Sequence, residues 1–266
     1  METELRKTGI EIVGDMPWGT HFCHFYETKE DLLDILVPYF KLGLKNNEFC
    51  IWVVFDPFNV EEARTALRRA IPELDQYLAQ GNIEIIPHSQ WYLKDGVFDL
   101  RRVIEGWKEK LAQALAGGYD GMRVNGNEAW LTETDWQNFS EYESELNGSL
   151  ASQRMIVLCT YPLAKTMAAE LFDVARTHEF VIAKRHGNWE VLETLELKQT
   201  KTEMKSLNEQ LEQRVLDRTS QLTSANEEMR KENAERKRIN KGKRPVNPTF
   251  SHPSVHGMLI TDIQVL

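Results

Sequence analysis

Residues 49–55 read FCIWVVF, an apolar run without a charged side chain. A strand covered by helices on both faces has no solvent side, so its sequence is continuously apolar rather than alternating. Asp56-Pro57 follows directly, and proline ends a strand because it has no N–H to donate. The run therefore predicts a buried parallel strand, and we expect it at the middle of the sheet.

Short apolar runs alternate with longer amphipathic stretches around this strand, from residue 20 to about residue 192. The apolar runs predict four further strands, at residues 20–26, 83–87, 122–125 and 154–161. The amphipathic stretches predict helices at residues 28–45, 60–70, 73–79, 100–116, 132–150 and 164–178. This alternation is typical of an α/β fold with a mostly parallel central sheet flanked by helices. Residues 180–195, with Gly187-Asn188 inside them, are predicted as a hairpin at the sheet edge.

The composition excludes several functional classes. The net charge of −9 argues against direct binding of nucleic acid, which needs a basic face. No apolar run reaches the length of about 18 residues that a membrane span requires, and residues 1–7 are charged. We therefore expect a cytoplasmic protein without a membrane segment.

Cysteine and histidine usage predicts a reduced protein. Cys23, Cys50 and Cys159 are odd in number and widely spaced, so no disulfide framework is expected and all three are predicted in the core. His21, Cys23 and His24 are candidate metal ligands. Side chains alternate along a strand, so His24 points away from the other two and at most two of the three can reach one ion. No metal or cofactor is assigned, and thiol sensing or haem ligation by His24 or His88 stays an alternative.

Residues 193–241 contain no glycine, proline or aromatic residue and predict one long helix. Its apolar residues follow coiled-coil spacing, with Arg218 and Leu207 off a perfect heptad, at Leu197, Met204, Leu211, Val215, Leu222 and Met229. An isolated helix would leave this stripe in water, so the spacing predicts a parallel homodimer. The alternative is a solvated helix that packs against its own domain.

Three segments resemble the MEDS family of sensory domains: GTHFCHFYETKEDLLDILVPYFKLGLKNNEFCIWV (19–53), GMRVNGNEAW (121–130) and IVLCTYP (156–162). The chain departs from the family pattern at Asn127, where a glutamate is expected directly after glycine; the acid here is Glu128. The resemblance implies a fold similar to RecA and KaiC that lacks their phosphate loop. Residues 26–31 (YETKED) fit this, because they lack the glycines that let backbone N–H groups surround phosphate, and they carry three acids. We therefore expect no ATP hydrolysis.

The tail carries a second resemblance. LEQRVLDRTSQLTSANEEMRKENAERKRI (211–239) resembles the signalling helix that joins sensory modules to PAS domains or histidine kinases, and HGMLITDIQVL (256–266) resembles the start of a PAS domain. The expected organisation is a sensory domain at 1–192, a signalling coiled coil at 193–241, and a linker or the beginning of a PAS-like domain at 242–266. The implied partners are a downstream PAS or kinase module, or a response regulator. The chain itself contains no kinase domain and is expected not to be an enzyme, although the full-length protein would be a histidine kinase.

Ligands of open α/β sheets bind outside the carboxyl ends of the strands, so the residues there are the predicted ligand site. They combine aromatic and polar side chains: Tyr26, Glu27, Asp56, His88, Trp91, Asn125, Glu128, Trp130 and Tyr161. The aromatic members could instead seal helix packing. The favoured function is a cytoplasmic sensory input domain, most simply of a two-component sensor, that binds a one-carbon or small apolar compound. The alternatives are a degenerate nucleotide-binding enzyme that uses Glu27 or Glu128 as acid or base, and a dimerisation platform without a ligand.

Overall fold

The computed structural model describes residues 4–132, 135–150, 153–193 and 195–242. Contacts within the chain divide it between Lys201 and Thr202 into an α/β body and a helical segment. Each part is therefore described by itself.

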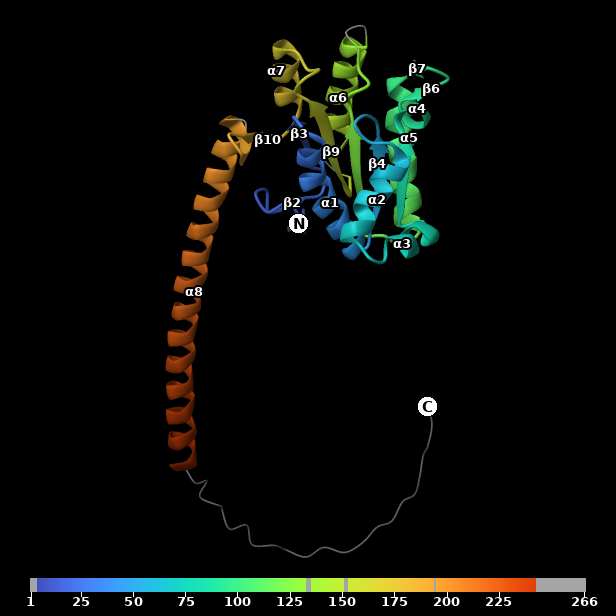
Figure 1. Cartoon of the computed structure of the whole chain (residues 1–266). Coiled ribbons are helices and arrows are strands. Elements are labelled where there is room, and N and C mark those ends of the chain that lie inside the picture. The colour runs from blue at the N-terminus through green and yellow to red at the C-terminus, as the bar shows by residue number, and fades with distance from the viewer. Residues whose placement is uncertain (1–3, 133–134, 151–152, 194, 243–266) are drawn as a thin grey trace, which may run out of the picture. The chain divides into compact units, whose positions relative to one another are not determined.

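The α/β body is built on a seven-stranded sheet, in the order β11-β10-β3-β9-β8-β4-β5 (Figure 1). The strands are β3 (His21–Tyr26), β4 (Glu48–Val54), β5 (Ile83–Pro87), β8 (Gly121–Asn127), β9 (Met155–Pro162), β10 (Phe180–Arg185) and β11 (Asn188–Glu193). All neighbours pair in parallel except β10 and β11, which are antiparallel. The predicted mostly parallel sheet flanked by helices is confirmed, as is the edge hairpin, whose turn places His186 and Gly187 at positive φ.

The apolar strand β4 is not at the middle of the sheet, so that prediction is wrong. It is second from the edge, between β8 and β5. All seven of its residues are nevertheless buried. A continuous apolar run therefore indicates that helices cover both faces of the strand, and it does not indicate that the strand is central in the sheet.

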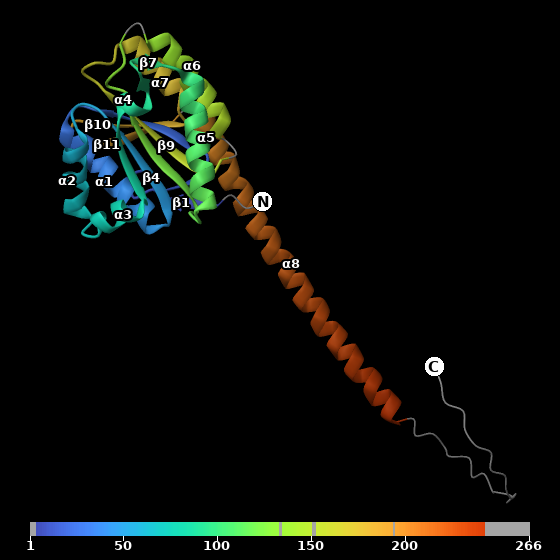
Figure 2. The ribbon, with the colours of Figure 1, turned by 90° about the vertical axis from the view of Figure 1, so that its right-hand side faces the viewer.

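Two helical layers provide that cover. α1 (Lys29–Lys45), α2 (Val60–Ala70) and α3 (Leu74–Gln80) pack on one face, and α5 (Leu100–Ala116), α6 (Trp136–Leu150) and α7 (Ala168–Thr177) pack on the other (Figure 2). A four-residue helix, α4 (His88–Trp91), follows β5. α1 begins as predicted, because the Thr28 hydroxyl accepts the Asp31 N–H at 3.1 Å and the Asp31 carboxylate accepts the Thr28 N–H at 3.2 Å.

Two helices on the second face begin later than the sequence predicts. α6 starts at Trp136 rather than at residue 132, and α7 starts at Ala168 rather than at residue 164. In the second case the Leu163 N–H donates to the Tyr26 carbonyl at 2.9 Å, which holds the chain to the end of β3 and away from a helical path. Residues 163–167 are consequently a loop at the carboxyl end of the sheet.

An N-terminal hairpin, absent from the prediction, is fixed to the sheet by a buried arginine. It consists of β1 (Leu5–Lys7) and β2 (Asp15–Pro17), and a second small hairpin pairs β6 (Leu93–Lys94) with β7 (Val97–Phe98). The fully buried Arg123 of β8 donates to the carbonyls of Lys7 and Thr8 at 2.9 and 2.8 Å. It also donates to the Glu48 carboxylate at 2.5 Å. The same guanidinium therefore pairs its charge with a carboxylate and hydrogen-bonds these two backbone carbonyls.

The segment beyond the body is one helix, α8 (Leu195–Gly242). Met204, Leu211, Val215, Leu222 and Met229 are all exposed on it, whereas the side chain of Leu197 lies outside the described residues. The predicted PAS-like segment at 243–266 also lies outside them. Among the helices that the structure describes, none is both long and apolar enough to cross a lipid bilayer.

We predict that Glu48→Gln lowers the free energy of unfolding by about 3–5 kcal/mol, because it leaves the Arg123 charge buried without its counter-charge. Equilibrium urea unfolding measures the change. Glu4→Gln is the control, since Glu4 pairs with Arg6 and Arg154 at a half-exposed site, where the loss should stay below about 1 kcal/mol. Equal losses in the two variants would contradict the prediction.

Candidate functional site

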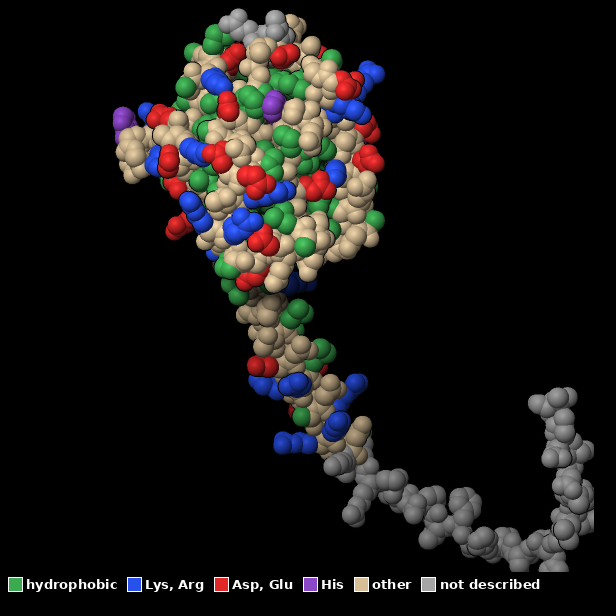
Figure 3. Space-filling model, turned by 45° about the vertical axis from the view of Figure 1, so that its right-hand side comes forward, with side chains coloured by type: hydrophobic (Ala, Val, Ile, Leu, Met, Phe, Trp, Pro, Cys, Tyr) green, Lys and Arg blue, Asp and Glu red, His purple; other side chains and the backbone are tan. Residues whose placement is uncertain are grey.

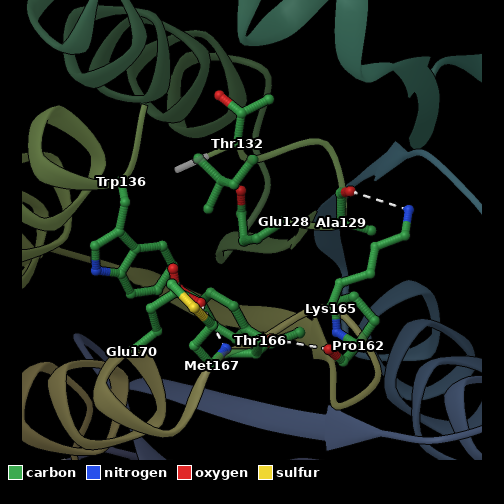
Figure 4. A pocket seen from close by; sticks show the side chains of 11 residues that line it. Glu128, Ala129, Thr132, Trp136, Pro162, Lys165, Thr166, Met167 and Glu170 are labelled. Carbon is green, nitrogen blue, oxygen red and sulfur yellow. Dashed lines mark hydrogen bonds between the residues drawn. The ribbon is translucent and has the colours of Figure 1, made fainter. Parts of the chain in front are cut away.

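A pocket of about 160 Å³ lies at the carboxyl ends of the neighbouring strands β8 and β9 (Figure 4). Two loops enclose it, the one that leads from β8 to α6 and the one that leads from β9 to α7. Its walls combine apolar and polar side chains, from Glu128, Ala129, Leu131, Thr132, Trp136, Tyr161, Pro162, Lys165, Thr166, Met167 and Glu170. This is the edge at which open α/β sheets bind ligands.

The loop at 163–167 forms one wall of the pocket, and its own hydrogen bonds hold its shape. The Thr166 hydroxyl donates to the Pro162 carbonyl at 2.8 Å, and the Met167 N–H donates to the Glu170 carboxylate at 2.7 Å, where α7 begins. The Lys165 ammonium lies 3.4 Å from the Ala129 carbonyl across the pocket. Side-chain contacts thus replace the first turn of helix that the sequence predicted, and they leave space for a ligand.

Glu128 is the more deeply buried of the two acids that line the pocket. Its carboxyl accepts hydrogen bonds from the Tyr92 hydroxyl and the Trp130 indole N–H, both at 3.1 Å. Burial raises the pKa of Glu128 well above its ordinary value, and the nearby charge of Glu143 raises it further. Both effects favour the neutral carboxyl, which keeps one O–H hydrogen to donate.

An aromatic cluster stands behind Glu128. Trp130 stacks on Tyr92 with ring centroids 5.4 Å apart and meets Phe139 edge to face at 5.9 Å. Trp130 therefore orients Glu128 from behind and does not line the pocket itself.

The nine predicted ligand residues do not form one site. Glu128 and Tyr161 line the pocket, whereas Asp56 and His88 border a separate surface hollow and Trp91 borders a third. Burial lowers the pKa of His88, and the neighbouring charge of Asp56 opposes that shift.

Of the remaining predicted residues, Tyr26 and Asn125 form hydrogen bonds within the chain and Glu27 faces solvent. The Tyr26 hydroxyl lies 3.3 Å from the Asn127 side-chain oxygen and from the Asp56 carbonyl, and Glu27 is exposed. Asn125 was expected as the last residue of its strand, but β8 continues to Asn127 and buries it. There its amide donates to the Leu158 carbonyl at 2.8 Å, which ties β8 to β9.

The sequence reasoning missed nine pocket residues: Ala129, Leu131, Thr132, Trp136, Pro162, Lys165, Thr166, Met167 and Glu170. Six of them, all but Ala129, Leu131 and Pro162, lie in segments that were predicted as helix. Pro162 was the available signal, because a proline favours an extended residue before it and a turn around it.

The candidate metal ligands separate as strand geometry requires. His24 faces the α1 layer, where its ring packs 5.3 Å from Trp189 and burial lowers its pKa to about 3. His21 and Cys23 face the α6 and α7 layer. There His21 meets Glu143, Cys159 and His178, all four of them buried. Burial raises the pKa of Glu143 to about 8 and lowers that of His178 to about 4.

Residues 20–179 match the profile of a protein family described as the methanogen/methylotroph, DcmR sensory domain, MEDS. The chain belongs to the MEDS family. A curated relative, the transcriptional repressor DcmR of Methylorubrum extorquens strain DM4, is 26% identical over 168 residues, which are 62% of this chain and 60% of the repressor. The chain thus spans 60% of the length of that relative, which is less than two thirds. The family match indicates a sensory role for residues 20–179 of this chain.

Among solved structures, a KaiC-like protein from the hyperthermophilic archaeon Pyrococcus horikoshii OT3 is similar to the MEDS chain. The two are 15% identical, with a TM-score of 0.48 over 71% of this chain and 85% of that one.

The MEDS sequence blocks occupy adjacent parts of the sheet. The first block forms β3, α1 and most of β4, the second forms β8 and the strand-end turn with Glu128, and the third forms most of β9. β3, β9 and β8 are neighbours in the sheet. The second and third blocks contribute to the pocket, and the first and third contribute His21 and Cys159 to the buried histidine cluster.

We predict that Glu128→Gln flattens the dependence of stability on pH. The folded MEDS domain holds the Glu128 proton more tightly than the unfolded chain, so this contribution is complete below the ordinary glutamate pKa of about 4.3. It is then lost as the pH rises toward the raised folded pKa. The wild type should lose up to about 1.4 kcal/mol per pH unit relative to the variant in this range.

Urea unfolding at several values between pH 5 and pH 8 measures the difference. Glu128→Met should show the same flattening with lower stability at every pH, because Tyr92 and Trp130 lose their acceptor. Parallel curves for the wild type and both variants would refute the assignment of a neutral Glu128.

Proposed function

We propose that this MEDS domain is the sensory input of a signal-transduction protein and binds a small, uncharged organic molecule in the pocket at the ends of β8 and β9. One observation carries the proposal: a partly enclosed pocket at the strand ends, with aromatic walls and a buried acid that favours its neutral form. Its lining combines aromatic and aliphatic side chains with polar groups, which are the components of small-molecule sites.

The size of the pocket restricts the ligand. An apolar protein cavity of about 150 Å³ holds one benzene molecule. The pocket has about 160 Å³, so a benzene-sized or smaller compound fits and a nucleotide does not. The charged groups at its rim are already engaged, Lys165 with the Ala129 carbonyl and Glu170 with the Met167 N–H. A one-carbon or small apolar compound, with one group that pairs with Glu128, suits this lining.

The start of α1 argues against the alternative function, a nucleotide-binding enzyme. The Asp31 carboxylate occupies the end of the helix where a phosphate would bind, and it also pairs with Lys184 at 3.0 Å.

On the face drawn in Figure 3, acidic and basic side chains are intermixed. That face offers no continuous basic stripe for a nucleic acid.

We assign transmission of the signal from the MEDS domain to α8. Leu211 and Leu222 are 58% and 57% exposed, although both are leucines on one heptad stripe. A second copy of the helix would cover this stripe as a parallel coiled coil. Arg218 lies at a core position of that heptad, where its charge weakens the packing. We propose that this weak point allows the coiled coil a second register. We infer that α8 passes the state of the MEDS domain to a downstream PAS or kinase module, as in two-component sensors.

A ligand can shift such an equilibrium only by binding one state more tightly than the other. The pocket wall at 163–167 leads into α7, and α7 continues through the β10–β11 hairpin directly into α8. Occupation of the pocket would therefore act on the segment that precedes the coiled coil in the chain.

We predict that toluene or dichloromethane, used as probes, stabilises the chain against thermal unfolding. Stabilisation of about 2.7 kcal/mol is expected when the free probe reaches 100 times its dissociation constant. The measurement is the unfolding midpoint as a function of probe concentration. Methylamine, which is charged at neutral pH, should have little effect.

Matched variants locate the binding site. Leu131→Trp fills the pocket and should abolish the stabilisation, because Leu131 lines it. Leu33→Trp is the control, since Leu33 is similarly half-buried but borders a different groove, beside α2. Equal responses in the two variants would exclude this pocket as the site, and no response in the wild type to any of the probes would remove the proposed ligand class.

We predict that single cysteines at Leu211 or Leu222 form a disulfide-linked dimer rapidly under mild oxidation, because a coiled coil brings these positions face to face. Gln213→Cys, two residues off the stripe, is the control and should crosslink more slowly. The three native cysteines are buried and should not contribute. A monomer by light scattering, with equal crosslinking at all positions, would refute dimerisation through α8.

A further inference from the structure

Four side chains from four elements converge between the sheet and the α6–α7 layer. They are His21 at the start of β3, Glu143 in α6, Cys159 in β9 and His178 directly after α7. One nitrogen, sulfur or oxygen atom of each lies within 4.8 Å of the others, and all four residues are at most 3% exposed. Polar groups so far from water require partners, since burial without them costs several kcal/mol.

Three of the distances between these atoms match the edges of a coordination tetrahedron, and all four atoms lie within 4.8 Å of one another. His21 Nε2 lies 3.3 Å from Cys159 Sγ and 3.2 Å from Glu143 Oε2, and His178 Nε2 lies 3.4 Å from Glu143 Oε2. Cys159 Sγ lies 3.7 Å from Glu143 Oε1. A tetrahedral ion with bonds of about 2.0–2.3 Å separates its ligands by roughly 3.3–3.7 Å.

The tautomer of His178 directs a lone pair into the cluster. His178 Nδ1 lies 2.7 Å from the Val174 carbonyl, which can only accept, so Nδ1 carries the hydrogen and Nε2 does not. His178 Nε2 and Glu143 Oε2 face each other, yet neither has a hydrogen-bond partner among the described residues. A cation between them would satisfy both. A backbone carbonyl on the far nitrogen is also the usual way to orient a metal-binding imidazole.

We propose that His21, Glu143, Cys159 and His178 bind one divalent transition-metal ion, and that Zn²⁺ is the ion that fits the site. Two nitrogens, one sulfur and one oxygen suit zinc, whereas Mg²⁺ and Ca²⁺ take oxygen ligands. Binding releases the thiol proton of Cys159 and the carboxyl proton of Glu143, and the resulting thiolate and carboxylate together neutralise the two positive charges. A neutral complex is the form that a buried site tolerates.

Four protein ligands leave no open position, so the ion has a structural role. It joins β3, β9, α6 and the end of α7 at one point. Tyr161 connects this point to the pocket, because it lines the pocket while its hydroxyl donates to Glu143 Oε1 at 3.2 Å. The metal proposal does not depend on the identity of the pocket ligand.

The test begins with the full chain, purified without a metal-affinity step and dialysed against metal-free buffer. Elemental mass spectrometry should find about one zinc ion per chain, as expected for a structural site. Removal of the ion with a chelator should lower the unfolding midpoint, and added Zn²⁺ should restore it. Co²⁺ in its place should give the absorption of a tetrahedral, thiolate-bound ion. A chain that carries no metal as purified, and takes up none from added Zn²⁺, would overturn the proposal.

Variants identify the ligands. Cys159→Ser and His178→Gln should lose the metal, whereas Cys50→Ser, the same change at a buried thiol in the opposite core, should keep it. Tyr161→Phe retains all four ligands and the fold but removes one hydrogen bond to Glu143, so its zinc affinity should fall about 10- to 100-fold. If the ligand variants do not fold, the Co²⁺ absorption of the wild type and the zinc affinity of Tyr161→Phe still test whether these residues bind the ion. Zinc content or affinity that is unchanged in all the variants would assign the metal to another site.

Discussion

A sheet covered by helices on both faces excludes water from its central strands, so each polar group there must find its partner within the chain. Arg123 meets this constraint most completely. Its guanidinium reaches the Glu48 carboxylate and the carbonyls of Lys7, Thr8 and Tyr39. One buried cation thereby fixes the N-terminal hairpin and α1 to β8. The position of β8, in turn, sets the position of the loop that it carries into the pocket.

The same constraint shapes the pocket. Glu128, the first residue after β8, is shielded from water, so Tyr92 and Trp130 supply its hydrogen bonds and burial favours its neutral form. Gly126 is required beside it, because a Cβ at that position would collide with the Tyr92 hydroxyl and the Glu128 carboxyl. An uncharged, oriented carboxyl at the end of a strand is suited to a weakly polar guest. It would bind a phosphate or a carboxylate poorly.

The sequence predicted what depends on local pattern and missed what depends on distant contacts. Apolar runs located the five predicted strands, and Gly187-Asn188 located the turn of the edge hairpin. The loop at 163–167 was missed because the Leu163 N–H bonds to Tyr26, well over a hundred residues away. The buried cluster was missed for the same reason, although one signal existed. Glu143 lies on the apolar face of its helix with Phe139 and Leu146, where an acid is unexpected.

The pocket and the cluster lie at opposite ends of α7, and this arrangement has a mechanical consequence. The loop and Glu170 hold the N-terminal end of the helix at the pocket, while His178 holds its C-terminal end in the cluster. If the loop is displaced, α7 remains fixed at His178, so it can tilt but cannot slide freely. A guest that displaces residues 163–167 would therefore turn α7 about His178, and a metal ion there would make that pivot stiff. Because His178 lies just before β10 in the chain, such a rotation would also move the β10–β11 hairpin, which leads to α8.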